Sequence, residues 1–193
     1  MLPRRRVGRL SAMARPQVPL EVDEATGVWS VDGMPMVLVP RHFLVNSHKA
    51  MEAAVGIDSN ARLAWEAGHK SAWTWCETEA RTHGLAGLDV FRHYMRRLSQ
   101  RGWGQFTIIA ADADSGRATV EVAHSVFAAE LGPGLDRRVC YPMAGWLVGA
   151  LEWVGQSLGH PCRLLAREVS CTAHDGGERC RFEVAPAPAE AGK

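Results

Sequence analysis

The sequence of 193 residues contains no run of about 20 apolar residues, so no segment is expected to span a bilayer. It also lacks the apolar stretch of a secretory signal peptide, because five arginines stand among its first 15 residues. An excess of charge is missing too, since 22 Lys and Arg balance 21 Asp and Glu. A nearly neutral chain is not expected to take nucleic acid as its main partner. We therefore expect a cytoplasmic protein with neither a membrane nor a nucleic-acid partner.

Motifs of independent catalysis are also missing. No glycine-rich dinucleotide fingerprint, phosphate-binding loop or Ser–His–acid arrangement is recognisable. Cysteine is scarce and odd in number, at five. With no export signal, an odd number favours free thiols or a metal site over a disulfide framework. The sequence thus leaves enzyme activity undecided and leans against it.

Length and composition indicate one domain with a hydrophobic core, since 47% of the residues are hydrophobic. We expect a disordered basic tail over residues 1–19, a single domain over 20–184 and a second disordered tail over 185–193. Either Met1 or Met13 could be the true start.

The spacing of apolar residues changes from helical to strand-like along the chain. Helical spacing predicts helices over residues 41–55, 88–99 and 139–158. A further helix could be capped by Asp58 or Ser59, and its apolar residues recur at helical spacing over 66–81. Alternation and turn residues predict short strands within 21–40, a hairpin of 104–111 with 117–123, and a second hairpin of 163–170 with 179–184. The order of these elements predicts an α+β fold.

Three thiols and a carboxylate near the C-terminus are candidates for a metal site. A turn between Cys171 and Cys180 can bring both sulfur atoms to one ion, and Cys140 precedes the long apolar helix. Zinc takes four tetrahedral ligands and prefers thiolates. A closed set of four protein ligands would make the site structural rather than catalytic. Buried free cysteines are the alternative.

The fourth position has two candidates, Glu168 and His174. Glu168 lies three residues before Cys171, which on a regular strand would place the two side chains on opposite faces. Both can bind one ion only if the strand ends or bulges between residues 169 and 171.

Three segments resemble the 4-vinyl reductase domain: Val139–Gly149, Glu168-Val-Ser-Cys171 and Gly177–Phe182. This bacterial domain occurs alone, in a protein linked to bacteriochlorophyll synthesis, and within the effector-sensing region of phenol-responsive transcriptional activators. In those sensors three cysteines and a glutamate hold a zinc ion in the same order. The resemblance implies Cys140, Glu168, Cys171 and Cys180 as zinc ligands. It further implies a homodimer in which a twisted antiparallel sheet packs against helices and zinc clamps the C-terminal hairpin.

The same resemblance implies an apolar pocket. Trp65, His69 and Trp73 recur at four-residue steps and therefore share one helical face. Because ligand pockets are mostly apolar with a few polar groups, the candidate ligand-binding residues are Trp65, His69, Trp73, Tyr94, Trp103, Gln105, His124 and Trp146. Core packing or a surface position is the alternative for each.

The expected function is a sensor or carrier domain that binds a small apolar or aromatic molecule and a structural zinc ion. Residues 27–43 resemble the opening of stand-alone members found beside genes for the breakdown of N-methylated amines. The chain could therefore be an accessory subunit of a flavin-dependent N-methyl amine demethylase system. The second alternative is a reductase of a vinyl or tetrapyrrole substrate.

Overall fold

The structure is a computed structural model, and it describes residues 18–188. The expected disordered tails, 1–19 and 185–193, lie largely outside these residues. In chain order the elements are β1 (Leu20–Val22), β2 (Trp29–Val31), β3 (Met34–Met36), α1 (Arg41–Val55), α2 (Ile57–His83), α3 (Leu88–Gln100), β4 (Gln105–Asp112), β5 (Arg117–Ala123), α4 (Val126–Leu131), α5 (Tyr141–Ser157), β6 (Leu164–Ser170) and β7 (Arg179–Pro186).

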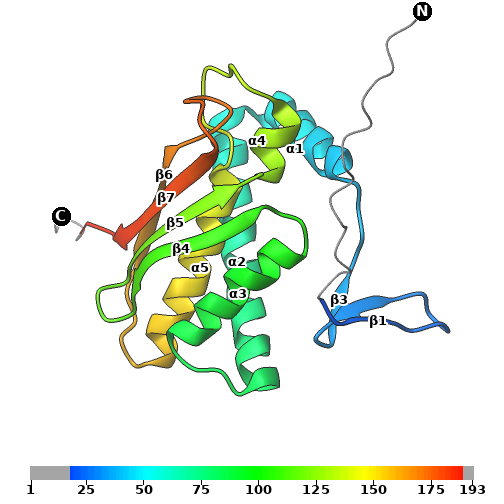
Figure 1. Cartoon of the computed structure of the whole chain (residues 1–193), viewed down its shortest axis with the longest axis vertical. Coiled ribbons are helices and arrows are strands. Elements are labelled where there is room, and N and C mark those ends of the chain that lie inside the picture. The colour runs from blue at the N-terminus through cyan, green and yellow to red at the C-terminus, as the bar shows by residue number, and fades with distance from the viewer. Residues whose placement is uncertain (1–17, 189–193) are drawn as a thin grey trace, which may run out of the picture.

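The predicted α+β fold is confirmed, because a twisted antiparallel sheet packs against helices (Figure 1). The four strands of this sheet follow the order β4-β5-β7-β6, and each neighbouring pair is antiparallel. Its two halves are the predicted hairpins, which meet where β5 pairs with β7. A smaller antiparallel sheet, β1-β2-β3, lies to one side of this body (Figure 1).

The alternation of apolar residues in the central strands explains which face of the large sheet is covered. In β5 the side chains of Val120 and Val122 are buried while their neighbours are partly exposed. In β7 the same alternation buries Cys180, Phe182 and Val184. Since successive side chains of a strand point to opposite faces, Cys180 lies on the covered face of the sheet.

Helix α5 forms the centre of the molecule. It packs against α2 and against strands β6 and β7, and 11 of its 17 residues are buried. A helix that is apolar on most faces is expected to be buried all round. Pro142 stands in the first turn, where its missing N–H breaks no helical hydrogen bond.

Two glycines allow the backbones of α5 and α2 to touch. A Cβ atom at Gly145 would lie 2.2 Å from the carbonyl oxygen of Trp65, and one at Gly149 would lie 2.3 Å from that of His69. No side chain fits at these distances, and glycine is the residue that permits such close backbone approach. The pair therefore fixes how α5 lies on α2.

The structure differs from the predicted elements in two places. The short helix α4 was not predicted. Strand β7 continues to Pro186, inside the segment expected to be a disordered tail. Pro186 pairs with Leu164 of β6, and a strand end tolerates proline because few ladder bonds are needed there.

Among the helices of residues 18–188, none is long and apolar enough to cross a bilayer.

Replacing Gly149 by alanine should destabilise the protein by about 1–3 kcal/mol, because the added methyl group must push α2 away from α5. This loss should appear even though alanine favours a helix by about 1 kcal/mol over glycine. Urea denaturation measures the difference. Gln156→Ala, an exposed position on the same helix, is the control and should change stability by less than about 0.5 kcal/mol. Equal midpoints for the two variants would contradict the close contact.

Candidate metal centre

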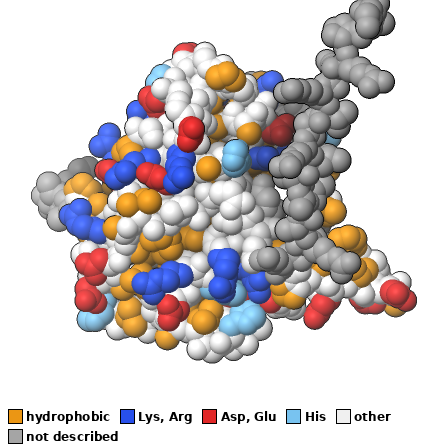
Figure 2. Space-filling model, in the orientation of Figure 1, with side chains coloured by type: hydrophobic (Ala, Val, Ile, Leu, Met, Phe, Trp, Pro, Cys, Tyr) orange, Lys and Arg blue, Asp and Glu red, His pale blue; other side chains and the backbone are white. Residues whose placement is uncertain are grey.

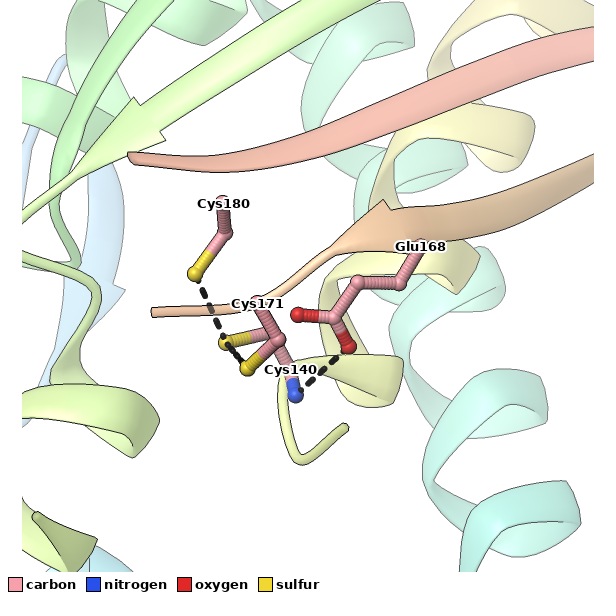
Figure 3. Close-up of side chains that lie close together, drawn as sticks. All are labelled: Cys140, Glu168, Cys171 and Cys180. Atoms are coloured by element: carbon pink, nitrogen blue, oxygen red, sulfur yellow. Dashed lines mark hydrogen bonds between the residues drawn. The ribbon is translucent and has the colours of Figure 1, made fainter. Parts of the chain in front are cut away.

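Three cysteines and one glutamate meet where the second hairpin approaches the start of α5 (Figure 3). Cys140 caps the N-terminus of α5, and Glu168 belongs to β6. Cys171 follows the last residue of β6, and Cys180 is the second residue of β7. The structure thus gathers all four residues predicted as metal ligands.

A β-bulge in β6 places Glu168 and Cys171 near the same point despite their three-residue spacing. Glu168 lies opposite Phe182 of β7, but Ser170 lies opposite Arg181, so the register shifts by one residue between them. A bulge of this kind re-aims the side chains that follow it. The prediction that the strand bulges or ends at residues 169–171 is confirmed, since β6 also ends at Ser170.

The sulfur atoms are spaced as they would be around one ion. The Sγ atom of Cys140 lies 3.6 Å from that of Cys180 and 4.0 Å from that of Cys171. Two ligands of a tetrahedral zinc with Zn–S bonds of about 2.3 Å would be about 3.8 Å apart. The donor atoms of all four residues lie within 4.8 Å of one another, and the three cysteines are fully buried. The cluster can therefore hold a metal ion.

One oxygen of the Glu168 carboxylate is hydrogen-bonded to the protein, and the other is unpaired. Its Oε2 accepts a hydrogen bond of 3.0 Å from the backbone N–H of Cys140. Its Oε1 is buried and has no hydrogen-bond partner, and Figure 3 shows this side of the carboxylate turned toward the sulfur atoms. A buried unpaired carboxylate oxygen is costly, so the geometry favours a cation beside it.

The protonation of the cluster also depends on a cation. Burial and the neighbouring Cys171 raise the pKa of Glu168 to about 8. The pKa of Cys140 is raised by its hydrogen bonds to the other two thiols and by burial. Hydrogen bonds from Cys140 and Cys171 lower the pKa of Cys180 to about 3. These opposite shifts favour a thiolate at Cys180 over one at Cys140, whereas a bound divalent ion would stabilise all the anionic forms.

Polar groups that the sequence did not single out surround the sulfur atoms. The hydroxyl of Ser125 lies 3.1 Å from Sγ of Cys140. The backbone N–H of Thr172 donates to Sγ of Cys180 over 3.4 Å. Such contacts orient thiolate ligands and reduce the repulsion between their charges.

Asp175 and Arg138 hold the loop that carries Cys171. Asp175 Oδ2 accepts a hydrogen bond of 2.8 Å from the N–H of Cys171 and one of 3.1 Å from Nε of Arg138. Arg138 also donates to the carbonyl oxygen of Glu168 over 3.1 Å. The pair Asp175-Gly176 belongs to the turn that the sequence predicts between Cys171 and Cys180.

Glu168, rather than His174, is the fourth residue of the cluster. His174 Nδ1 lies 2.9 Å from the carbonyl oxygen of Leu135, to which it can donate, and the ring stands at the surface. Cys76 and Cys162 are outside the cluster, in α2 and just before β6. Cys76 is fully buried in the core, and Cys162 is partly buried against it.

The predicted aromatic stripe exists on α2 and contains a hydrogen-bonded histidine. The ring of His69 lies 5.2 Å from that of Trp65 and 6.2 Å from that of Trp73, between centroids. Its Nε2 is 2.7 Å from Oε2 of Glu152 on α5. The other carboxylate oxygen of Glu152 accepts a hydrogen bond of 2.7 Å from the N–H of Leu164, the first residue of β6. His69 therefore helps to join α2, α5 and the sheet.

The other five candidate ligand residues lie in several places. Trp103 and Trp146 meet edge to face, with ring centroids 4.8 Å apart. Tyr94 is buried in the core. Gln105 and His124 are exposed at one end of the β4–β5 hairpin.

The surface has two hollows that no tryptophan lines. One of about 550 Å³ adjoins the metal cluster, and its lining includes His124, Ser125, Thr172 and Arg179. The other, of about 340 Å³, lies across the far ends of β4, β5 and β7. Of the predicted ligand residues, His124 alone contributes to the lining of either hollow.

A comparison with protein-family models matches residues 14–109 to a family described as "Domain of unknown function (DUF5943)". The match spans the N-terminal strands, the first three helices and part of β4, and it stops before the thiol cluster. The resemblance to the 4-vinyl reductase domain, carried by residues 139–182, therefore stays a prediction. A comparison with curated proteins gives no match.

Solved structures of similar fold include two proteins with a bound small molecule. The phenol-responsive sensory domain of the transcription activator PoxR, with phenol, has a TM-score of 0.74 at 16% identity, over 86% of this chain and 84% of that one. Trafficking protein particle complex subunit 3 from Naegleria fowleri, covalently bound to palmitic acid, has a TM-score of 0.53 at 11% identity. That match covers 76% of this chain and 95% of the other chain. The chain thus has the fold of this sensory domain.

The metal cluster should be essential for stability. Replacing Cys171 by serine, or removing metal with a chelator, should lower the free energy of unfolding by more than about 4 kcal/mol, since structural metal binding is coupled to folding. Thermal denaturation and elemental analysis of the purified protein check this. Cys162→Ser, outside the cluster, should retain the metal. A Cys171→Ser protein with unchanged metal content and melting temperature would rule the cluster out as a metal site.

Proposed function

We propose that this chain is a sensor or carrier domain for a small apolar or aromatic molecule, stabilised by a structural zinc ion. Solved structures of similar fold include one with phenol and one covalently bound to palmitic acid. The observation that carries the proposal is the concentration of partly buried aromatic rings where α2, α5 and the segment before β4 meet. Such surfaces, with a few polar groups, are typical of ligand sites.

Zinc is the metal that best suits the donor set of the cluster. Soft thiolates select zinc or copper(I) over magnesium, calcium or manganese, and zinc accepts a mixed set of sulfur and oxygen ligands. Cys140, Glu168, Cys171 and Cys180 would supply four ligands and leave no position for a substrate. The zinc ion would then fix the second hairpin to α5, and the chemistry of recognition would lie elsewhere.

Trp146 occupies the central position in the proposed ligand region. A Cβ atom at Gly68 would lie 2.7 Å from Cδ1 of Trp146, so the indole rests directly on the backbone of α2. On its other side Trp146 contacts Trp103. Along α2, Trp65 lies three residues before Gly68 and His69 follows it directly. A rotation of Trp146 would open this region to an aromatic molecule, with the His69–Glu152 pair as the polar group.

The pure protein is titrated with phenol and, separately, with palmitic acid. The ligand class that it binds should change its tryptophan fluorescence. Trp146→Ala should weaken that binding about tenfold or more, because the ring supplies contact area that is lost on truncation. Trp29→Ala, in the small sheet, is the matched control and should bind normally. Calorimetry that detects no binding of either class would contradict the proposal. Oxidation of reduced nicotinamide by the pure chain would instead favour a reductase.

We further propose a homodimer that forms through the N-terminal part of the chain. Among residues 18–188, 12 of the 15 exposed large apolar side chains lie between Leu20 and Leu63. Val37 and Leu38 are each 79% exposed, and Phe43 is 58% exposed. Figure 2 shows hydrophobic and acidic side chains together on the surface of the small sheet. Exposed apolar side chains gathered in one part of a chain are typical of an interface.

Replacing Val37 and Leu38 by serine together should convert the dimer into a monomer, because the interface would lose two of its most exposed apolar side chains. Light scattering coupled to size-exclusion chromatography reports the mass. Leu165→Ser, which removes an exposed apolar side chain from β6, should leave the dimer intact. A wild-type chain that is monomeric at micromolar concentration would contradict the homodimer and leave this surface for an enzyme partner.

A further inference from the structure

A second cluster of possible metal ligands lies where the small sheet meets the helices. It consists of Asp32 in the turn between β2 and β3, Glu79 and His83 on α2, and His93 on α3. Their four donor atoms lie within 4.8 Å of one another. The spacing of Glu79 and His83 puts both on one face of α2. Three separate parts of the chain therefore converge on one point.

The side chains of this second cluster are joined by one hydrogen bond and two ion pairs, at distances near those between ligands of one metal ion. Oε2 of Glu79 lies 2.6 Å from Nε2 of His93 and 3.2 Å from Nε2 of His83. Oδ1 of Asp32 lies 3.3 Å from the same nitrogen of His83. Ligands of one metal ion with bonds of about 2.0–2.2 Å would be about 3.0–3.5 Å apart. Small adjustments would place all four donor atoms around an ion.

One oxygen of Glu79 provides an independent sign of a missing partner. The side chain of Glu79 is 1% exposed, yet its Oε1 has no hydrogen-bond partner. The neighbouring carboxylate of Asp32 is also almost fully buried, at 4% exposed. Arg97 pairs with Asp32, so the unpaired oxygen of Glu79 is the group that an added cation would stabilise.

The local backbone is built to insert Asp32 into this position. Asp32 has a φ of 51° and Gly33 a φ of 75°, the conformation of a two-residue hairpin turn that favours the pair Asp-Gly. Val31, just before the turn, is 1% exposed, so the end of the hairpin is anchored in the core. The turn thus presents the Asp32 carboxylate to α2 and α3.

We propose that Asp32, Glu79, His83 and His93 form a second metal site, which binds a divalent transition-metal ion through two imidazole nitrogens and two carboxylate oxygens. This donor set contains no thiolate and suits zinc, manganese or iron(II). The two carboxylates would neutralise the ion. Since His83 is 31% exposed, solvent can reach the site, and a metal can enter without unfolding.

Two arginines contact ligands of the proposed site, and one of them must move when a metal ion binds. Arg97 contacts both oxygens of Asp32, at 3.0 and 2.8 Å, and would orient that carboxylate toward the ion. Arg96 donates to Nδ1 of His93 over 2.9 Å, which places the imidazole proton on Nε2. Metal binding through Nε2 moves that proton to Nδ1, so Arg96 must turn away. Its side chain is exposed and free to do so.

Titration of the metal-free protein with Co²⁺ separates the two sites. The thiol cluster should give intense sulfur-to-cobalt charge-transfer absorption in the near ultraviolet. The second site should bind a further equivalent that adds only weak visible bands, because its ligands are nitrogen and oxygen. Calorimetry counts the equivalents independently of colour. Retention of this equivalent in Cys171→Ser would show that it does not belong to the thiols.

Variants of the second site make the assignment specific. His83→Gln changes a partly exposed side chain and should weaken the second equivalent about 100-fold or more, with the charge-transfer bands unchanged. Glu79→Gln should have the same effect. Glu77→Gln, an exposed position on the same helix, is the control and should bind as the wild type. A single equivalent of Co²⁺ in the wild-type protein, or a second equivalent that survives His83→Gln, would overturn the proposal.

Discussion

The contact between the backbones of α2 and α5 is the constraint on which the rest of the molecule depends. Gly145 and Gly149 let α5 lie against the carbonyl oxygens of Trp65 and His69, and a fixed contact at two successive turns leaves little freedom in the crossing of the helices. Cys140 precedes the first turn of α5, and Glu79 and His83 belong to the last turns of α2. One contact between helices therefore positions both polar clusters.

The two clusters attach opposite parts of the chain to this pair of helices. The thiols join the β6–β7 hairpin to the start of α5, and the group around Glu79 joins the small sheet to α2 and α3. The tryptophans lie between these two points along the helices. Since the backbones of the helices are also held together in this middle part, a ligand bound there would be accommodated by rotation of side chains such as Trp146.

Sequence patterns predicted the regular elements well because their apolar spacing is strong and local. The three-residue spacing of Glu168 and Cys171 even required a strand irregularity, and the structure has a bulge there. The short helix α4 was missed because its six residues make fewer than two helical turns, too few for apolar residues to recur at helical spacing. Spacing alone could not choose between Glu168 and His174, since that choice depends on how the turn after β6 directs the His174 ring toward Leu135.

Contacts between distant segments were the part that the sequence could not predict. Asp32 stands in a turn of the small sheet, and nothing in the local sequence indicates that its carboxylate meets Glu79, which lies 47 residues further along the chain. The partner of His69 likewise lies on another helix, at Glu152. Such pairs follow from the way the helices pack, and that packing is settled by the close approach at two glycines rather than by a local pattern.

The two attachments of β6 to α5 have a consequence for the edge of the sheet. β6 is an edge strand, and edge strands are prone to slip in register or to pair with another molecule. Its first residue, Leu164, is held by Glu152, and its last residue is followed directly by Cys171 of the thiol cluster. A slip of two residues would keep every side chain on its own face and yet break both attachments. The helix thereby sets the register of a strand that the sheet supports on one side alone.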